Sequence, residues 1–411
     1  ALLSDQHQGS IFKALYKINL LAEKQQIQKN SENSLDIKQL FMLIDDCIHL
    51  GTIPFSILAR HGFIAKTLLL SLVQCGILSM DEVNHILASI RTVASDLVDD
   101  MNRSQTKEIS RNKFMAQYGH LRPGTYDIMS SRYDQMPDFG QMDFKTVQKK
   151  EISKMELTLS QKKSIDKLLK SKGFTGMDCE NFLTYVRQAT AGREYGKFIF
   201  THSVSNILEI IAKYGEDHFL SREELSHISI NDFLSIVKNS SDYNIENRLR
   251  KISEINKEKN KISSAVRLPQ VLFDEAGVFI VPFQVSHPNF ITSKKITAKC
   301  VILVPDMTHP NLTGKIVLIE NADPGYDWIF TQNSTGLITK YGGVASHMAI
   351  RCAEINLPAA IGCGDSMFEK LKKSSKIMLD CKNKQILILE HVLDDESIEE
   401  RKVLKSLGYI K

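Results

Sequence analysis

The stretch that decides the fold of the C-terminal part is "KYGGVASHMAIRCAEINLPAAIGCG", residues 340–364. Two adjacent glycines, Gly342 and Gly343, come shortly before a serine and a histidine. Ser346 is a favourable N-cap residue, so we expect a helix to begin there with His347 in its first turn. The paired glycines predict a turn into this helix where the missing side chains let a ligand approach the backbone.

The first turn of this helix is suited to a phosphate group. Its backbone N–H groups have no partner within the helix and lie at the positive end of the helix dipole. A neutral imidazole is a nucleophile near pH 7 and can carry a phosphoryl group covalently. Arg351 lies four residues after His347, so both side chains can face the same side. Met348, Cys352 and Ile355 have helical spacing and predict the buried stripe, which leaves His347 and Arg351 outside it.

These residues alone leave two interpretations of His347 open. It is either a phosphate carrier or an ordinary polar residue near the start of a helix. The "GGxxSH" string is more specific than a lone histidine and less specific than a Walker A loop.

After about residue 270 the hydrophobic pattern changes from helical to strand-like. Short β-branched runs bounded by Gly, Pro, Asn or Asp predict strands at 277–283, 299–305, 314–320, 335–340, 358–363, 376–380 and 385–390. The last two runs predict a hairpin that turns at residues 382–384. One helix is expected near 346–356 and a second over 365–374. These patterns together predict a compact α/β domain.

The part of the chain before residue 260 is mainly helical by its pattern. Residues 79–82, "SMDE", and 221–224, "SREE", are capping boxes, and each predicts the start of a helix. Gly215 follows a long helical run and predicts its end. Residues 119–137 contain proline, glycine and paired serines, so we expect an ordered loop there.

The expected fold class is therefore α plus α/β, with a mainly helical N-terminal domain followed by a compact α/β domain. The predicted domains are a helical domain over 1–262, a linker with the first strand over 263–293, and an α/β domain over 294–395. A helical tail is expected over 396–411. The strongly charged stretch 247–269 predicts a solvated helix that leads into the linker.

Composition excludes several classes of function. A net charge of +4 over 411 residues gives little attraction to nucleic acid or to a membrane surface. We expect no apolar stretch to reach the ~20 residues of a transmembrane helix, and the start lacks a signal-peptide pattern. The seven cysteines are scattered and never spaced as CxxC, which favours reduced cytoplasmic thiols over disulfides or a zinc site. We expect a cytoplasmic protein without a metal site.

Three segments carry a resemblance to a known family: "GKIVLIENADPGYDWIF" at 314–330, "TGLITKYGGVASHMAIRCAEINLPAAIG" at 335–362 and "KIMLDCKNKQILIL" at 376–389. Together they resemble the swivelling phosphohistidine domain of the PEP-utilising enzymes, which include PEP synthase, pyruvate phosphate dikinase and rifampicin phosphotransferase. The family pattern is a strand, an acid-rich turn, a strand ending in GG-x-x-SH-x-A, a helix, and G-I-P-A-V-x-G. The residues that fit it are Gly342, Gly343, Ser346, His347, Ala349, Ile350, Glu354, Pro358, Ala359 and Gly362. The resemblance implies that His347 is the phosphorylated residue and that the α/β domain swivels. The local pattern described above, not the resemblance, makes Gly342, Gly343, Ser346 and Arg351 the expected neighbours of the phosphate. Family members often have an arginine directly before the glutamate of this helix, where this chain has Ala353 and its arginine lies two residues earlier.

The helical portion is similar, more loosely, to the middle region of rifampicin-phosphotransferase-like proteins. The segments that carry this likeness are 59–73, 118–128 and 192–215. In that family the region holds the acceptor substrate, which implies six acceptor-binding candidates: His61, His120, Arg122, Tyr126, Arg187 and Arg193. His120 and Arg122 are favoured because loops carry function more often than helices do. The alternative is that His61 fills a gap between helices and that Arg187 is an ordinary surface charge.

The sequence shows no glycine-rich ATP-grasp loop, no P-loop, and no run of strand–helix units after residue 395 that would form a PEP-binding barrel. We therefore expect no cofactor within this chain, with ATP and Mg²⁺ bound by a missing or separate ATP-grasp domain or subunit. The expected partners are that ATP-grasp unit and a small-molecule acceptor, without nucleic acid or membrane.

The expected function is to relay phosphate from ATP through a phosphohistidine to the acceptor, as part of a dikinase-type phosphotransferase. The alternative is a degenerate, non-catalytic family member that acts as a binding or regulatory module. A helical nucleic-acid binder is disfavoured because no basic stripe occurs. A Ser–His hydrolase is disfavoured because the side chains of adjacent Ser346 and His347 diverge by about 100° around a helix.

Overall fold

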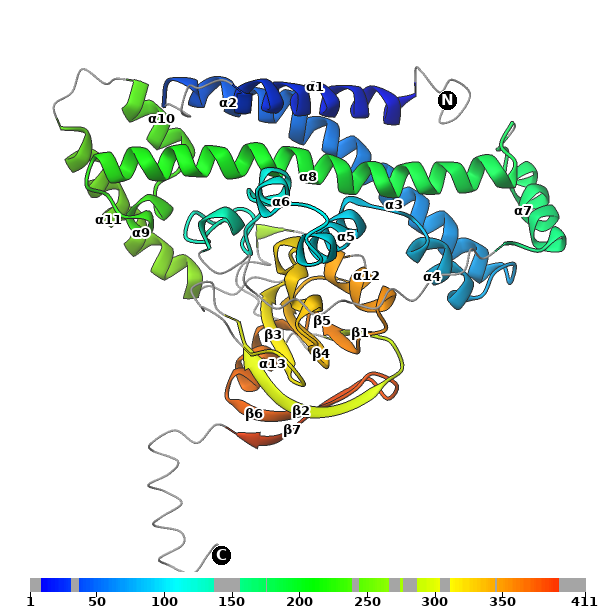
Figure 1. The fold of residues 1–411 in the computed structure, drawn as a ribbon. Helices are drawn as coiled ribbons and strands as arrows, with labels where there is room; N and C mark the ends of the chain where they lie inside the picture. The colour runs from blue at the N-terminus through cyan, green and yellow to red at the C-terminus, as the bar shows by residue number, and fades with distance from the viewer. Residues whose placement is uncertain are drawn as a thin grey trace, which may run out of the picture. The chain divides into compact units, whose positions relative to one another are not determined.

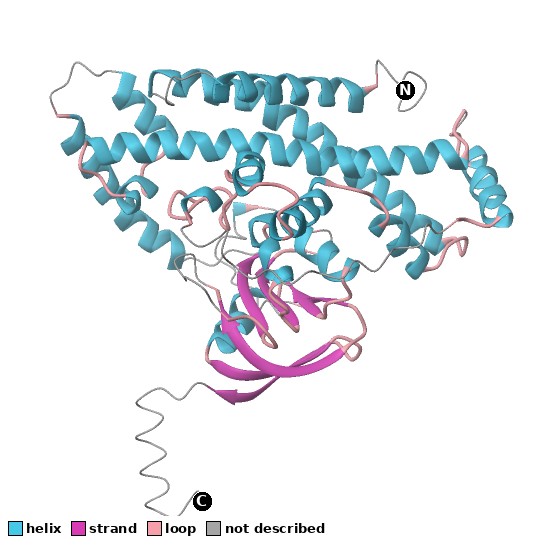
Figure 2. Ribbon diagram, viewed as in Figure 1, coloured by secondary structure: helices cyan, strands magenta, loops and turns pink. Residues whose placement is uncertain are grey.

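The computed structural model describes residues 9–30, 37–136, 156–174, 176–238, 244–265, 274–275, 287–303, 311–343 and 346–391. Contacts divide these residues into two units, a helical unit up to residue 275 and a sheet unit from residue 287 onward. Figure 1 labels the elements of both units, and Figure 2 separates helix from strand. The organisation into a mainly helical N-terminal part and a C-terminal part with a mixed sheet is as predicted.

The helical unit is organised around α8, a helix of 39 residues, Cys179–Asp217. Helices α1, α2 and α3 pack along it (Figure 1). The other elements follow in chain order. The bounds are α1 Ser10–Asn30, η1 Ile37–Gln39, α2 Leu40–Asp46, the π-helical turn η2 Cys47–Thr52, α3 Ile53–Gln74, α4 Met80–Ala88, α5 Val93–Gln105, α6 Arg111–Tyr118, η3 Tyr133–Gln135, α7 Leu159–Ser171, α9 Arg222–Ser226, α10 Ile230–Lys238 and α11 Ile245–Ala265.

Close packing against α8 requires glycine at two places. A Cβ atom on Gly51, in the π-helical turn η2, would lie 2.9 Å from the Cβ atom of Phe200. A Cβ atom on Gly196 would lie 3.0 Å from a methyl group of Leu58 in α3. The long helix and the pair formed by η2 and α3 therefore approach each other more closely than residues with side chains would allow.

Both helix starts predicted from capping boxes are confirmed. Ser79 and Glu82 form the capping box of α4, and Ser221 and Glu224 form that of α9. The prediction that the long helix ends at Gly215 is wrong, because α8 continues to Asp217. Gly215 is buried, and a Cβ atom there would lie 2.5 Å from a methyl carbon of Leu225. This glycine serves helix packing rather than helix termination.

The continuous helical stretch Ile37–Gln74 is long and apolar enough, by length and composition alone, to cross a membrane, which the sequence analysis did not anticipate. Part of its apolar surface lies in the core, where Leu40, Leu58 and Leu69 are fully buried. Of the most apolar 18-residue segment of this stretch, 28% is buried. One such helix does not establish a membrane protein, because core helices of soluble proteins pass the same test.

The sheet unit contains a seven-stranded mixed sheet in the order β1-β5-β4-β3-β2-β6-β7. Strands β2 to β5 pair in parallel, whereas β1 with β5, β2 with β6, and β6 with β7 are antiparallel. The bounds are β1 Asn289–Ile291, β2 Lys295–Ile302, β3 Ile316–Asn321, η5 Pro324–Thr331, β4 Gly336–Tyr341, α12 His347–Glu354, β5 Ala359–Ile361, α13 Gly364–Lys372, β6 Ser374–Asp380 and β7 Gln385–His391.

The predicted C-terminal hairpin and both predicted helices of this unit are confirmed by β6, β7, α12 and α13. One face of the sheet packs against α13 through Phe368 and Leu371, which are fully buried. The strand expected over 277–283 and the tail expected over 396–411 lie outside the described residues. Strand β1 falls within the segment predicted as linker and first strand. The predicted domain boundaries and the swivelling motion stay predictions.

Candidate functional site

The glycine pair leads into α12 as the sequence predicts. Ser346 has an extended backbone, and its side chain accepts a hydrogen bond from the N–H group of Ala349 at 3.4 Å. The N–H group of Ser346 donates to the carbonyl of Gly343 at 2.8 Å. Ser346 is therefore the N-cap and His347 is the first helical residue. The side chain of His347 lies outside the described part of the structure.

The two glycines of the turn have different roles. Gly342 has a φ of +130°, and a Cβ atom there would lie 2.7 Å from the Cβ atom of Ala322. A Cβ atom on Gly362, which has a φ of +75°, would lie 2.3 Å from the carbonyl oxygen of Gly342. Backbone packing therefore dictates glycine at both positions. A Cβ atom on Gly343 would meet open space, so this residue leaves room for a ligand at the helix start.

Side chains at the end of β4 hold the turn in place. The hydroxyl of Thr339 accepts a hydrogen bond from the N–H group of Gly362 at 2.9 Å. Asp365 accepts one from the hydroxyl of Tyr341 at 2.8 Å and lies 2.9 Å from the amino group of Lys340. Although burial opposes it, the Asp365 carboxylate and the Tyr341 hydroxyl raise the pKa of Lys340. The glycine turn is therefore anchored to the first turn of α13.

Helix α12 buries more residues than the predicted stripe. Met348 and Cys352 are fully buried and Ile355 is half-buried, as the spacing predicts. The prediction that Arg351 stays outside the buried face is wrong, because only 7% of it is exposed. Its guanidinium lies 6.0 Å from the centre of the Phe330 ring in η5.

The surroundings of Arg351 explain why a charged residue is buried there. Asp327 of η5 is fully buried. Burial raises the pKa of the Cys352 thiol, while the positive charge of Arg351 lowers it and the negative charge of Asp327 raises it. Both charges therefore act on the same thiol across the packed surfaces of α12 and η5. Arg351 is a structural cation of the sheet unit, whatever it also does for a phosphate.

In the helical unit, His61 lies among the core helices. It is 6% exposed, with the hydroxyl oxygen of Ser10 2.7 Å from its Nε2 atom and that of Tyr185 3.1 Å from its Nδ1 atom. Burial and the charge of Arg60 lower its pKa. Both ring nitrogens thus have partners within the unit, which fits the gap-filling interpretation.

His120 packs against a second histidine. The centres of the rings of His120 and His202 are 4.4 Å apart, and Phe198 makes a further edge contact with His120. The Nε2 atom of His120 and the Nδ1 atom of His202 are buried and have no hydrogen-bond partner. Burial and nearby positive charge, including Arg132, hold the pKa of His120 well below its usual range and lower that of His202 to about 4. Both rings are therefore neutral near pH 7.

Arg122 fastens the loop after α6 to the long helix. It is 2% exposed, and its guanidinium donates to the hydroxyl of Ser205 at 3.0 Å and to the carboxylate of Glu209 at 2.9 Å. Glu209 also binds Arg222 at 2.9 Å. Although burial opposes it, hydrogen bonds from Arg222 and Gln135 lower the pKa of Glu209 to about 2. This charged network joins the loop, α8 and α9.

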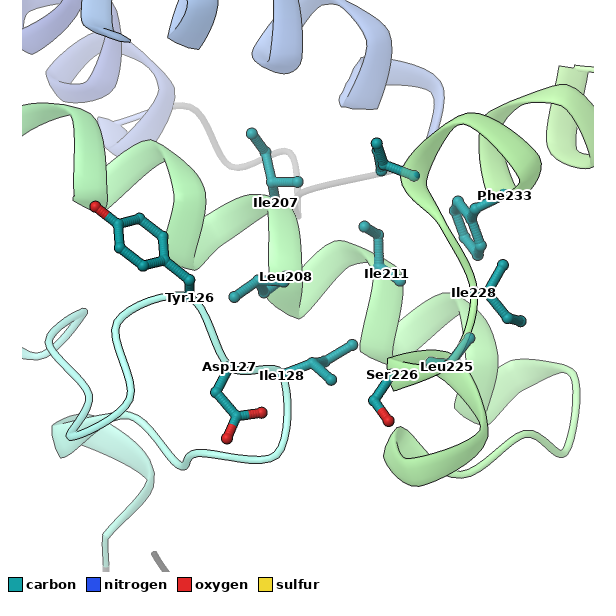
Figure 3. Close-up of a pocket in the computed structure, with 11 residues that line it drawn as sticks. Tyr126, Asp127, Ile128, Ile207, Leu208, Ile211, Leu225, Ser226, Ile228 and Phe233 are labelled. Atoms are coloured by element: carbon teal, nitrogen blue, oxygen red, sulfur yellow. The ribbon is translucent and has the colours of Figure 1, made fainter. Parts of the chain in front are cut away.

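The remaining candidates lie apart from one another. Arg187 is exposed on α8, and Arg193 lies 5.3 Å from the centre of the Phe63 ring. Tyr126 is 60% exposed and borders a pocket of about 320 Å³ in the helical unit (Figure 3). The structure thus brings His120, Arg122 and Tyr126 to one stretch of α8, and leaves His61, Arg187 and Arg193 elsewhere in the helical unit.

Sequence reasoning missed His202, Glu209 and Arg222. The spacing of His202, Ser205 and Glu209 on α8 is a polar stripe at helical period, which could have pointed to the face that receives the loop. Within the described ranges, no cluster of three or more His, Cys, Asp or Glu side chains is placed to hold a metal ion.

Comparison with known proteins agrees with the geometry of the sheet unit. Residues 310–384 match the family model described as the mobile domain of PEP-utilising enzymes. A segment of 89 residues is 28% identical to phosphoenolpyruvate synthase of Escherichia coli (strain K12). That segment is 21% of this chain and 11% of the relative. The chain thus matches a small part of that enzyme's length.

Proposed function

We propose that this chain, which carries the mobile domain of the PEP-utilising enzymes over residues 310–384, is a phosphoryl carrier that acts through His347. The similarity to a PEP synthase supports a phosphotransfer role at the level of the family. The observation that carries the finer proposal is the start of α12. There His347 follows an N-cap serine and lies four residues from a glycine that faces open space.

In the first step, an imidazole nitrogen attacks a phosphorus atom of the donor. A nitrogen–phosphorus bond forms, the bond between phosphorus and the leaving oxygen breaks, and the leaving group takes the electron pair. The N–H groups at the start of the helix and the helix dipole stabilise the new negative charge, the dipole by ~0.3–1 kcal/mol. We propose ATP as the donor, bound with Mg²⁺ on an ATP-grasp domain or subunit.

In the second step, an oxygen of the acceptor attacks the same phosphorus atom. The nitrogen–phosphorus bond breaks, its electron pair returns to the imidazole nitrogen, and the proton of the attacking hydroxyl passes to solvent. We propose that the helical unit holds a small-molecule acceptor. Of the six candidates, Tyr126 is both exposed and at the edge of a pocket, whereas His61 and Arg122 are occupied by partners inside the unit.

The test is phosphate uptake by the full chain. It is mixed with an ATP-grasp polypeptide, Mg²⁺ and ATP labelled with ³²P in its β and γ phosphates. We expect label that is lost in acid and stable in base, absent from His347→Ala and retained in His85→Ala, a variant of an exposed histidine on α4. Label on Ser346, or label that persists in His347→Ala, would reject the assignment. A chain that takes up no label with any donor would support the non-catalytic alternative.

A further inference from the structure

We infer that the helical unit binds an uncharged, largely apolar small molecule in the pocket shown in Figure 3. The pocket has a volume of about 320 Å³, which is at the lower end of the roughly 300–1,000 Å³ typical of small-molecule sites. Its lining residues are Tyr126, Asp127, Ile128, Ile207, Leu208, Ile211, Leu225, Ser226, Ile228, Ile230 and Phe233. They come from the loop after α6, from α8, and from α9, α10 and the turn between them.

The walls are mainly hydrocarbon. Ile207 and Ile211 lie one turn apart on α8, and Figure 3 shows them beside Leu208. Leu225 and Phe233 belong to the same buried cluster as the two isoleucines. A ligand with a carbon-rich body would remove apolar surface of both partners from water, which is the main driving force for binding in such sites.

One wall is held at a fixed distance by buried charge. The guanidinium of Arg122 donates to the carbonyl of Asp127 at 3.2 Å, and that of Arg222 donates to the carbonyl of Ile128 at 3.0 Å. Both arginines bind Glu209 behind this wall. These bonds tie the loop backbone to the charged network on α8 and α9, while Ile128 of the loop packs into the same buried cluster as Ile207 and Ile211. Hydrogen bonds and apolar packing together therefore fix the position of this wall.

The polar groups indicate the charge of the ligand. Among the residues that line the pocket, Asp127 is the one Asp, Glu, Lys, Arg or His, and its carboxylate accepts a hydrogen bond from the N–H group of Met129 at 2.9 Å. The hydroxyl of Ser226 donates to the carbonyl of Glu223 at 2.7 Å. An anion would be repelled by Asp127, and a cation would lose hydration against aliphatic walls. A neutral molecule with a hydrogen-bond donor near Asp127 fits both constraints.

This inference does not depend on phosphoryl transfer, and the test separates the two. The full chain is titrated with N-phenyl-1-naphthylamine, an uncharged aromatic fluorescent probe, and with its anionic relative 8-anilinonaphthalene-1-sulfonate. We expect saturable binding of the neutral probe at one site and weaker binding of the anionic one. His347→Ala should bind the neutral probe as the unmodified chain does, even if phosphate uptake is lost.

Leu208→Asn places a polar group in the pocket wall and should weaken neutral-probe binding by about tenfold or more. Leu234→Asn is the matched control, because Leu234 is half-buried against the same cluster but does not line the pocket. Equal affinity in both variants would overturn the inference. So would tighter binding of the anionic probe, or no saturable binding, by the unmodified folded chain. The comparison of the two probes on the unmodified chain tests the inference even if a variant does not fold.

Discussion

The guanidinium of Arg351 lies over the ring of Phe330 in a helix face that is otherwise apolar. Its spacing from His347 suggested a phosphate clamp, and the structure shows that it also belongs to the core. Arg351 and Asp327 are both buried and both act on the Cys352 thiol, and removing a charged group from such a packed region of low dielectric constant is costly.

Arg351→Ala should therefore lower the free energy of unfolding by ~1–3 kcal/mol, measured by chemical denaturation. The spacing of Arg351 from His347, taken alone, predicts a different result: Arg351→Ala would slow transfer by about ten- to a hundredfold and leave folding nearly intact. Arg351→Lys keeps the charge and should recover most of the stability. If the Arg351→Ala chain that remains folded transfers phosphate at the normal rate, Arg351 is purely structural.

The glycine pair allows a sharper test at the level of single residues. Gly342→Ala introduces strain at a positive φ and a clash with Ala322, so it should destabilise the sheet unit by more than ~1 kcal/mol. Gly343→Ala meets no atom and should fold normally, yet slow phosphate uptake by filling the space beside the helix start. Normal uptake by a folded Gly343→Ala chain would show that no ligand approaches the backbone there.

At the scale of elements, helix starts are predictable because a capping box depends on four consecutive residues, as at 79–82 and 221–224. Features that depend on contacts with distant parts of the chain cannot be predicted from a short stretch of sequence. Gly215 follows the sequence rule for a helix end, but its role is set by Leu225 on another helix. Strand β1 is three residues long and forms by pairing with β5. No local sequence pattern predicts this pairing.

The features of the candidate sites also divide into those that depend on local sequence and those that depend on distant contacts. The N-cap of α12 could be read from the sequence because Ser346 bonds within its own first turn. The burial of Arg351 depends on η5, and the pocket depends on three segments whose residues lie up to about a hundred positions apart. Among the six acceptor candidates, the sequence could not separate a residue engaged in the core, such as His61, from one at a pocket edge, such as Tyr126.

The histidine pair between the loop and α8 predicts a pH dependence of stability. The pKa of His202 is lowered from 6.5 to about 4 in the folded chain, so the unfolded chain binds more protons between these values. Stability should be full above pH 6.5 and decline as the pH falls toward 4. His202→Gln should flatten this decline in urea titrations at stepwise pH, and His85→Gln, at an exposed site, should not. The same slope in both variants would contradict the assignment.

The charged network of Arg122, Glu209 and Arg222 should contribute measurably to the stability of the helical unit. Glu209→Gln leaves Arg122 and Arg222 without their carboxylate and should cost ~3 kcal/mol or more. Glu223→Gln breaks an exposed pair with Lys257 and should leave stability nearly unchanged, because solvent screens such pairs. Thermal unfolding of both variants checks the difference. A Glu209→Gln chain as stable as Glu223→Gln would show that the network does not hold the loop.

At the scale of the whole molecule, the chain combines two units of different character. One matches the mobile domain of a phosphotransfer family, and the other contains a pocket with a fixed wall. A phosphate relay needs a phosphoryl carrier, a unit that binds the acceptor, and a unit that phosphorylates the carrier from ATP. The proposal assigns the first two to this chain and the third to an ATP-grasp partner.

Phosphoryl transfer through this chain, as proposed, requires a phosphoryl group on His347. The most direct measurement is peptide mapping by mass spectrometry, under alkaline conditions, of the full chain after incubation with the ATP-grasp partner and Mg-ATP. We predict phosphate on the peptide that contains His347, at that residue, and its disappearance when the sample is acidified. Phosphate on Ser346 or on another histidine, with the peptide of His347 unmodified, would contradict the account.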